Sequence, residues 1–381
     1  MEDKEKRFFQ QQEKLDCDNE VKIKNIYGKE KFPPERAKQY IDWIVNNFKE
    51  HFSSLDYKEG QSVPISSGVD PSVRFIGSPI SVFKPRLVNR QIPYPGIFMR
   101  QDCIRTKNSD KLLNDDFLPA WGSYFPNMGA ITPPERISDG CNEAFDFFEK
   151  KLGISRENIL IRINSQDGDL LDICRGRYKD TNLEVDSRKI DYYRHKLGIE
   201  GFGGRNCNIA LRGSSGEGFS DVANLIVIED KGSPVCLEIS IGTTTILKEL
   251  YGLDHVQDGV PVEGLRFADE KFRRKFEDAI VTSSVLFHEG LRPLGQQNRN
   301  RILKKYVQSL SYFRAKCDIQ ITDLSKIINE FEEREFSSTN ERVTDILINY
   351  IIAFENELEG KKELTPDQDK IKLALQTLSI K

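Results

Sequence analysis

The sequence predicts an α+β fold followed by an all-helical part, and two observations support this prediction. Up to about residue 262, short apolar runs bounded by glycine and proline alternate with a few amphipathic helical segments. From about residue 264 onward, apolar residues recur at helical spacing throughout. We therefore expect a polar leader at residues 1–35, an α+β domain at 36–262 and a helical domain at 263–381.

Composition limits the class of protein. The chain has 381 residues, of which 38% are hydrophobic and 30% charged, as expected of a soluble protein with about two or three domains. The net charge of −4 argues against DNA binding and leaves RNA binding to a local basic patch. The sequence lacks an apolar run of about 18 residues and a secretory leader, so we expect a cytoplasmic protein without a membrane span. Scattered cysteines without a CxxC pair indicate reduced thiols and no structural metal.

Local signals place elements in the α+β part. An apolar face predicts a helix at Arg36–Phe52. A second helix is predicted at Asn142–Leu152, and Gly153 ends it. Residues 164–204 are polar and typical of irregular structure, and the glycine-rich stretch Asn206–Val222 indicates a turn. The predicted strands are Val73–Ile76, Ile159–Ile163, Leu225–Ile228 and Val235–Ile239, the last of which leads through small residues into a helix at Ile246–Tyr251.

The stretch Ile92–Met128 predicts an antiparallel hairpin. An apolar run is followed by Arg100, then by Arg105 and Lys107 in a polar loop, and the chain returns through the aromatic residues Phe117, Trp121, Tyr124 and Phe125. A guanidinium can bind phosphate through its planar fork, and an aromatic face can cover a base. The same pattern also fits an ordinary hairpin with a solvated, charged tip.

The C-terminal part is predicted to be a series of helices. Candidates span Phe267–Phe287, Arg301–Cys317 and Ile321–Phe331. A capping box at Ser338–Glu341 precedes a further apolar periodic stretch, and Thr365–Gln368 caps the last helix with proline at its first position.

Several blocks, taken in order, resemble one known family. They are the helix Arg36–Phe52, Ser72–Pro85, the Gln101-Asp102-Cys103-Ile104-Arg105 stretch, Asn206–Val222, Leu237–Gly242 and Asp278–Pro293. Together they resemble the catalytic half of alanyl-tRNA synthetase, a class II aminoacyl-tRNA synthetase. The third block resembles the family's Q-x-C-x-R strand of motif 2, the fifth its V-D-T-G-M-G of motif 3, and the sixth the D-H-x-R…A-D-G-x-x-P of its acceptor-stem domain. The family's editing and C-terminal domains have no counterpart in this sequence.

The resemblance implies a fold and a reaction. The fold would be a class II antiparallel sheet flanked by helices, followed by a helical acceptor-stem domain. The substrates would be an amino acid and ATP with Mg²⁺. The amino-acid carboxylate would attack the α-phosphate and give an aminoacyl-adenylate and pyrophosphate. The acyl group would then pass to a tRNA or to another acceptor, so the resemblance implies an aminoacyl-tRNA synthetase-like ligase.

The resemblance also implies roles for single residues. Arg105 would hold the α-phosphate as the catalytic residue, with Lys107, Asp221 and Gly242 also at the ATP. For Arg105, the alternative is a surface arginine that pairs with a nearby aspartate, Asp102 or Asp110. Glu238 stands where the family's aspartate binds the substrate amine, and Asn208 stands in the amino-acid pocket. For Glu238, the alternative is an outward-facing strand residue.

Three departures from the family pattern bear on activity. The motif 3 arginine, which clamps the far phosphates, falls at Thr245, and losing one such donor typically costs about 3 kcal/mol unless Lys248 or another cation replaces it. The family's pocket tryptophan falls at Asn208, so the amino acid need not be alanine. The asparagine that reads the acceptor stem falls near Gly295 or Gln296. The alternative function is therefore a non-catalytic, synthetase-derived protein that binds tRNA, a nucleotide or a protein partner.

A basic cluster near the start of a predicted helix is the candidate tRNA contact. It consists of Arg299, Arg301, Lys304 and Lys305. Phosphate contacts require only such charges. A solvated face of an amphipathic helix explains the same cluster equally well.

Overall fold

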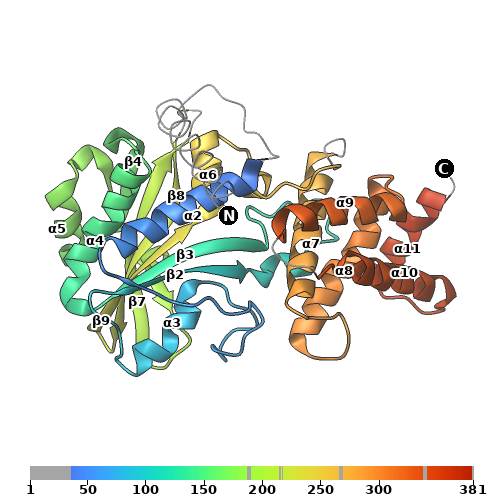
Figure 1. Ribbon diagram of the computed structural model, residues 1–381, viewed down its shortest axis with the longest axis horizontal. Helices are drawn as coiled ribbons and strands as arrows, with labels where there is room; N and C mark the ends of the chain where they lie inside the picture. Colours follow the sequence, from blue (N-terminus) through green and yellow to red (C-terminus); the bar gives the residue numbers. More distant parts are fainter. Residues whose placement is uncertain are drawn as a thin grey trace, which may run out of the picture.

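The computed structural model describes residues 36–186, 190–213, 216, 218–265, 269–337 and 341–379. Within these residues, nine strands form one sheet in the order β1-β2-β3-β9-β8-β7-β4-β5, with β6 beside β7 (Figure 1). The strands are β1 Lys58–Glu59, β2 Ile97–Ile104, β3 Tyr124–Thr132, β4 Ile159–Asn164, β5 Leu183–Asp186, β6 Arg194–Lys196, β7 Phe202–Arg212, β8 Phe219–Asp230 and β9 Ser233–Gly242.

The described helices flank this sheet or follow it. Those that belong to the sheet part are α2 Ala37–Ser53, α3 Pro79–Val88, α4 Ile137–Asp146, α5 Gly168–Arg177 and α6 Thr243–Tyr251. The C-terminal set is α7 Glu270–His288, α8 Asn298–Lys316, α9 Ile321–Glu335, α10 Thr344–Gly360 and α11 Pro366–Ser379, which gathers at the opposite end of the molecule (Figure 1). None of the described helices is long and apolar enough to cross a membrane.

Strand pairing confirms the predicted fold class. The six central strands β2, β3, β9, β8, β7 and β4 pair with one another in antiparallel fashion, whereas β1 and β5 pair in parallel with β2 and β4 at the two edges. The predicted hairpin Ile92–Met128 contains β2 and β3, which pair with each other from Ile97↔Ile131 to Ile104↔Tyr124. The chain is therefore an α+β protein with an antiparallel sheet flanked by helices and followed by C-terminal helices.

The two faces of the sheet differ in how they are covered. One face presents apolar side chains such as Phe98, Met128, Leu225 and Ile239 to a core shared with α2, α4, α5 and α6. The other face packs against α3 through a smaller apolar cluster of Phe83, Leu87, Met99, Ile131 and Ile226. Since α3 covers only part of this second face, polar strand residues beside it can line a cavity.

The C-terminal helices and the sheet part share a core. Helices α7 to α11 bury their own apolar faces together, and Ile65, Phe75, Ile104 and Leu112 from the sheet part belong to the same cluster. Ile104 ends β2, and Leu112 lies in the connection between β2 and β3. The helical part therefore packs directly on the connection that carries Arg105.

Some local predictions were wrong. Val73–Ile76 is not a strand: the Ile76 N–H donates to the Ile65 carbonyl and the Ile76 carbonyl accepts from the Ile104 N–H, but its neighbours do not extend a ladder. Pro79 begins α3, which was not predicted from the sequence; a proline at the first helical position loses no hydrogen bond. The segment 164–204, predicted as irregular, contains α5. The leader at 1–35, residues 266–268 and Ser338–Asn340 of the predicted capping box lie outside the described residues.

Candidate functional site

Strand register places Arg105 and Glu238 on the same face of the sheet. Paired residues in neighbouring strands share a face, and side chains alternate along each strand. Gln101 of β2 pairs with Asn127 of β3, and Ile131 of β3 pairs with Glu238 of β9. Arg105 follows β2 four residues after Gln101 and therefore keeps the orientation of this face. Both side chains line one cavity of about 490 Å³, a volume within the range of small-molecule sites.

Glu238 is a buried carboxyl without a partner. Its side chain is 4% exposed and has no hydrogen bond or ion pair with another described residue. Burial raises its pKa to about 8, because the charged form loses its water without gaining a partner. This contradicts the alternative of an outward-facing strand residue. An ammonium group entering the cavity would supply the missing charge and donors.

Three other polar side chains, from β3, β8 and β9, line the cavity together with Glu238. Asn127 is 5% exposed, and its Oδ1 is buried without a hydrogen-bond partner among the described residues. The Asn127 Nδ2 lies 3.5 Å from Ser240 Oγ, and Asn224 pairs with Ser240 across β8 and β9. All four residues line the cavity. The cavity therefore offers free acceptor oxygens on Glu238 and Asn127, which could bind a ligand group that carries N–H donors.

Arg105 is a cation without an acidic partner. Its side chain is exposed, and its guanidinium lies 4.8 Å from the ring centre of Phe125 and 5.6 Å from that of Trp121. Desolvation by these surroundings lowers its pKa. The predicted alternative, a surface ion pair with a nearby aspartate, is wrong, because Asp102 pairs with Arg100 at 2.8 Å and Asp110 pairs with Lys305. The guanidinium is free to bind an anion.

A second cavity begins on the other side of Arg105. It measures about 480 Å³ and shares Val73, Gly77 and Arg105 with the first. Its further lining includes Lys107 and the half-exposed ring of Trp121. Arg105 thus lies between a polar cavity that contains Glu238 and a cavity with an aromatic wall and a second cation.

Asp221 and Asn208 lie on the same sheet face but beside the cavity. Asp221 accepts hydrogen bonds from Arg162 Nη1 at 2.6 Å, from Asn208 Nδ2 at 2.8 Å and from the Tyr192 hydroxyl. Asn208 pairs with Asn224, which does line the cavity. Both carboxylate oxygens of Asp221 are therefore engaged. No group of three or more acidic, histidine or cysteine side chains that could hold a metal occurs among the described residues.

The segment that resembles motif 3 brings no cation into the cavity. Gly242 is the residue before α6, and its carbonyl accepts a hydrogen bond from Thr245 Oγ1 at 2.7 Å. Lys248 forms an ion pair with Glu249 at 2.7 Å. None of these residues lines the cavity with Arg105. The Thr245 hydroxyl therefore bonds within the first turn of α6. Lys248 does not supply the cation that the resemblance to motif 3 would place at position 245.

The sequence reasoning missed several cavity residues. Asn127 stands in the return strand of the hairpin, and only its position two residues after Phe125 signals the same face. Lys84 of α3 forms a buried ion pair with Asp70 at 2.6 Å. Although burial raises the pKa of Asp70, hydrogen bonds from Lys84 and Ser72 lower it overall. His195 also lines the cavity, and its Nε2 lies 3.0 Å from Asn206 Oδ1. No local sequence pattern indicated His195.

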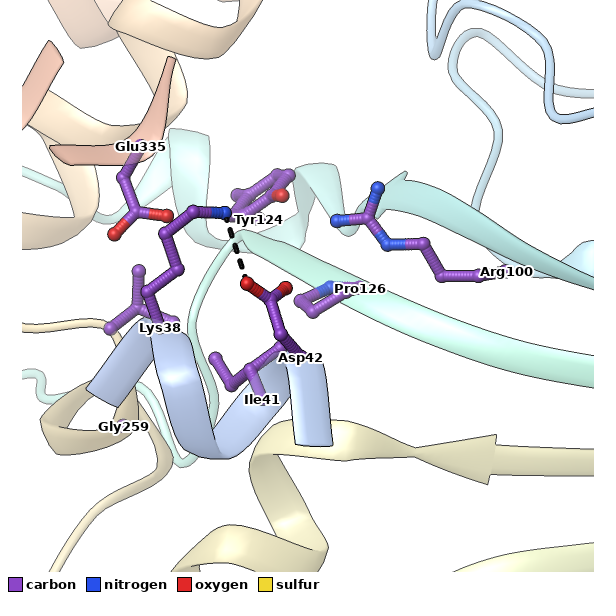
Figure 2. Close-up of a pocket in the computed structure, with 9 residues that line it drawn as sticks. Lys38, Ile41, Asp42, Arg100, Tyr124, Pro126, Gly259 and Glu335 are labelled. Atoms are coloured by element: carbon purple, nitrogen blue, oxygen red, sulfur yellow. Dashed lines mark ion pairs between the residues drawn. The ribbon is translucent and has the colours of Figure 1, made fainter. Parts of the chain in front are cut away.

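A small hollow lies on the opposite sheet face near the hairpin. Figure 2 shows Lys38 and Asp42 of α2 facing Tyr124 and Arg100, with Glu335 of α9 beside Lys38. Lys38 and Asp42 form an ion pair at 3.5 Å. The hollow measures about 30 Å³, which suits one water rather than an amino acid. Arg100 therefore belongs to a structural contact, unlike Arg105 on the other face.

The basic cluster on α8 divides into engaged and free side chains. Arg299 donates to the carbonyl of Ser67 at 3.0 Å and to that of Arg74, and Lys305 pairs with Asp110. Arg301 and Lys304 are exposed and have no ion-pair partner among the described residues. Contact with RNA stays a prediction, and it would depend on these two cations.

The chain was compared with known proteins. No protein-family model and no curated protein sequence matches it. Among solved structures it is similar to an aspartyl tRNA synthetase from Entamoeba histolytica at 8% identity, with a TM-score of 0.34 over 58% of this chain and 57% of that chain. It is also similar to the histidyl-tRNA synthetase of S. aureus (10% identity, TM-score 0.35, 59% of this chain and 72% of that chain). A putative threonyl-tRNA synthetase, ThrRS-1 from Aeropyrum pernix, gives 10% identity, a TM-score of 0.37, and 78% and 75% of the two chains.

This chain thus spans less than two thirds of the length of the Entamoeba histolytica protein. All three solved structures are aminoacyl-tRNA synthetases by their descriptions.

Proposed function

We propose that this chain activates the carboxylate of an amino acid with ATP, as class II aminoacyl-tRNA synthetases do, and passes the acyl group to a tRNA or another acceptor. One observation supports this most directly: a free guanidinium and a free buried carboxyl, Arg105 and Glu238, line the same cavity. An aminoacyl-adenylate has an ammonium group near one end and a phosphate next to its acyl carbon, so its charges complement this pair.

Each residue would act by position and charge. Glu238 binds the ammonium group of the amino acid and so places the carboxylate toward Arg105. Arg105 binds the α-phosphate and stabilises the negative charge that grows as a carboxylate oxygen bonds to phosphorus and the bond to the pyrophosphate oxygen breaks. Preorganised charges of this kind supply most of the rate acceleration in phosphoryl and acyl chemistry without covalent help.

The second cavity would take the nucleotide. Trp121 offers a ring face for the base, and Lys107 offers a second cation for the phosphates. Mg²⁺ is usually held by substrate phosphates and one or two carboxylates, so it would enter with ATP rather than occupy a site made by the protein alone. Asp221, with both oxygens engaged, would order the sheet next to the cavity.

Exchange of labelled pyrophosphate into ATP, measured with each amino acid in turn, tests the proposal. We expect exchange with at least one amino acid and its loss in Glu238→Gln. Glu277→Gln is the matched control, since Glu277 is also a buried carboxyl with a pKa raised by burial, to about 7, but lies in α7. The absence of exchange with every amino acid in the folded protein would overturn the proposal.

A second function has its own supporting observation. The cavity receives no cation from the α6 segment, because Thr245 bonds to Gly242 and Lys248 pairs with Glu249. A protein of this kind would bind an amine or nucleotide without forming an adenylate. Calorimetry separates the two functions. Amino-acid binding without ATP binding, together with exchange activity gained in Thr245→Arg, would favour the binding protein; binding of ATP together with pyrophosphate exchange by the natural chain would favour the enzyme.

A further inference from the structure

The connection that carries Arg105 is anchored in the C-terminal helices. It runs from Arg105 to Ser123, between β2 and β3. Lys275 of α7 donates to the carbonyl of Asn114 at 2.6 Å, and Lys370 of α11 donates to that of Leu113 at 2.6 Å. Lys305 of α8 pairs with Asp110. The helices therefore hold this connection from outside the sheet.

Ser123 is the point at which this anchoring reaches Arg105. The Arg105 backbone N–H donates to the Ser123 carbonyl at 2.8 Å. On the helix side, Asp278 of α7 accepts from the Ser123 N–H and from its hydroxyl, both at 2.6 Å. The Tyr306 hydroxyl of α8 donates to Ser123 Oγ at 2.7 Å. Ser123 is thus hydrogen-bonded both to side chains of α7 and α8 and to the backbone of Arg105.

A second route through the same network holds the ring beside Arg105. Asn108 donates from Nδ2 to the Trp121 carbonyl at 2.9 Å and to Ser123 Oγ at 3.2 Å. The hydroxyl of Ser123 therefore donates once and accepts twice, which is its full capacity. Ser123, Asn108, Asp278 and Tyr306 are all at most 3% exposed. Such a fully satisfied buried network has one low-energy geometry, since breaking any bond strands a polar atom.

We propose that Asp278 and Tyr306 are positioning residues that set, through Ser123, where the Arg105 guanidinium stands between the two cavities. Neither residue lines either cavity, so they would act only through the backbone of the connection. The consequence for catalysis rests on the proposed function of Arg105. The effect on the position of the Arg105 guanidinium does not rest on the proposed function, and it can be tested separately.

Trp121 reports on Arg105 without any assay of activity. The chain has two tryptophans, so Trp43→Phe leaves Trp121 as the only one. In this background, Arg105→Ala defines the change in Trp121 emission and acrylamide quenching when the guanidinium is absent. We expect Tyr306→Phe and Asp278→Asn to change both signals in the same direction, and the Tyr306→Phe effect to shrink in the presence of Arg105→Ala to the part that reaches Trp121 through Asn108.

Tyr312→Phe is the matched control. Tyr312 also lies on α8, is equally buried, and donates its hydroxyl to the same connection, to Asp115 Oδ1 at 2.7 Å. We expect no change in the Trp121 signals from this variant. Unchanged signals in Tyr306→Phe and in folded Asp278→Asn, or an effect of Tyr306→Phe that is undiminished by Arg105→Ala, would overturn the proposal.

Pyrophosphate exchange adds the catalytic test. We expect Tyr306→Phe to lower the exchange rate roughly tenfold, since small misplacements of a positioned group reduce rates strongly, with the KM for the amino acid unchanged. An unchanged rate would overturn the catalytic part of the proposal. If the natural chain shows no exchange at all, the proposed function fails while the fluorescence result still decides the positioning role.

Discussion

Arg105 and Glu238 stand on the same face of one antiparallel sheet, with β3 between the strand that precedes Arg105 and the strand that holds Glu238. Both lack an oppositely charged partner among the described residues, and both line one cavity. An unpaired acidic group is costly in a protein interior, so the buried Glu238 is more informative about function than the many paired charges elsewhere on the sheet.

The first prediction concerns stability and pH. The pKa of Glu238 rises on folding from 4.5 to about 8, so the native state is penalised progressively as pH rises above 4.5, and fully above pH 8. Glu238→Gln removes this penalty and should make the protein more stable at pH 9, by at most about 5 kcal/mol at ~1.4 kcal/mol per pKa unit. Urea unfolding at pH 5 and pH 9 measures the difference, and a variant that is less stable at pH 9 would contradict it.

A second prediction concerns proton release on amine binding. Below pH 8 the Glu238 carboxyl is protonated, and an ammonium ligand favours its ionised form, so binding should release up to one proton. Affinity should therefore rise about tenfold per pH unit from pH 6 toward pH 8. Calorimetry in buffers of different ionisation enthalpy counts the protons. Equal heats in all buffers would count against Glu238 as the amine ligand.

A third prediction concerns Arg105. Arg105→Lys keeps a charge but loses the planar fork, and Arg105→Ala loses both. We expect the exchange rate to fall by about a hundredfold in Arg105→Ala, as for other preorganised donors, and by less in Arg105→Lys. Amino-acid binding without ATP should be unaffected in both. Arg100→Ala on the opposite face is the control, and equal losses in the two alanine variants would refute the assignment.

The fourth prediction concerns acid stability of the helical part. Although burial raises the pKa of Glu332, bonds from His288 at 2.7 Å and from the Thr344 and Val343 backbones lower it overall to about 2. This stabilisation is fully present above pH 4.5 and is lost as pH falls toward 2. Glu332→Gln should cost roughly 3 kcal/mol at pH 7 and nothing at pH 2. Thermal unfolding across this range measures it; a loss that does not depend on pH would exclude ionisation as the cause.

A fifth prediction concerns RNA. If α8 contacts an acceptor stem, the free side chains Arg301 and Lys304 should supply the phosphate contacts. Replacing both by glutamine should lower the slope of log affinity against log salt concentration by about 2, at roughly 0.9 per phosphate contact. Lys316→Gln, an exposed lysine at the far end of α8, is the control. An unchanged slope in the double variant would mean that the basic cluster is only the solvated face of an amphipathic helix.

Local physical chemistry determined most of the elements from the sequence alone. Alternating and helical apolar periods placed the hairpin, β9, α2 and the C-terminal helices, because burial of one face is a local requirement. Residue chemistry pointed to Arg105 as a cation that could bind phosphate, whereas Glu238 was selected only through the resemblance to alanyl-tRNA synthetase. The same local rules misread Val73–Ile76, because the backbone partners of Ile76 are Ile65 in the preceding loop and Ile104 at the end of β2, which no local period encodes.

Only the tertiary structure decided which of these residues meet. The register of β2, β3 and β9 puts Arg105 and Glu238 in one cavity, and it brings in Asn127, while Asn208 and Asp221 turn toward each other beside it. The link from Asp278 to Arg105 through Ser123 joins parts of the chain that share no local pattern. Local periodicity cannot encode such contacts, since they depend on strand order and on helices packed from the far end of the sequence.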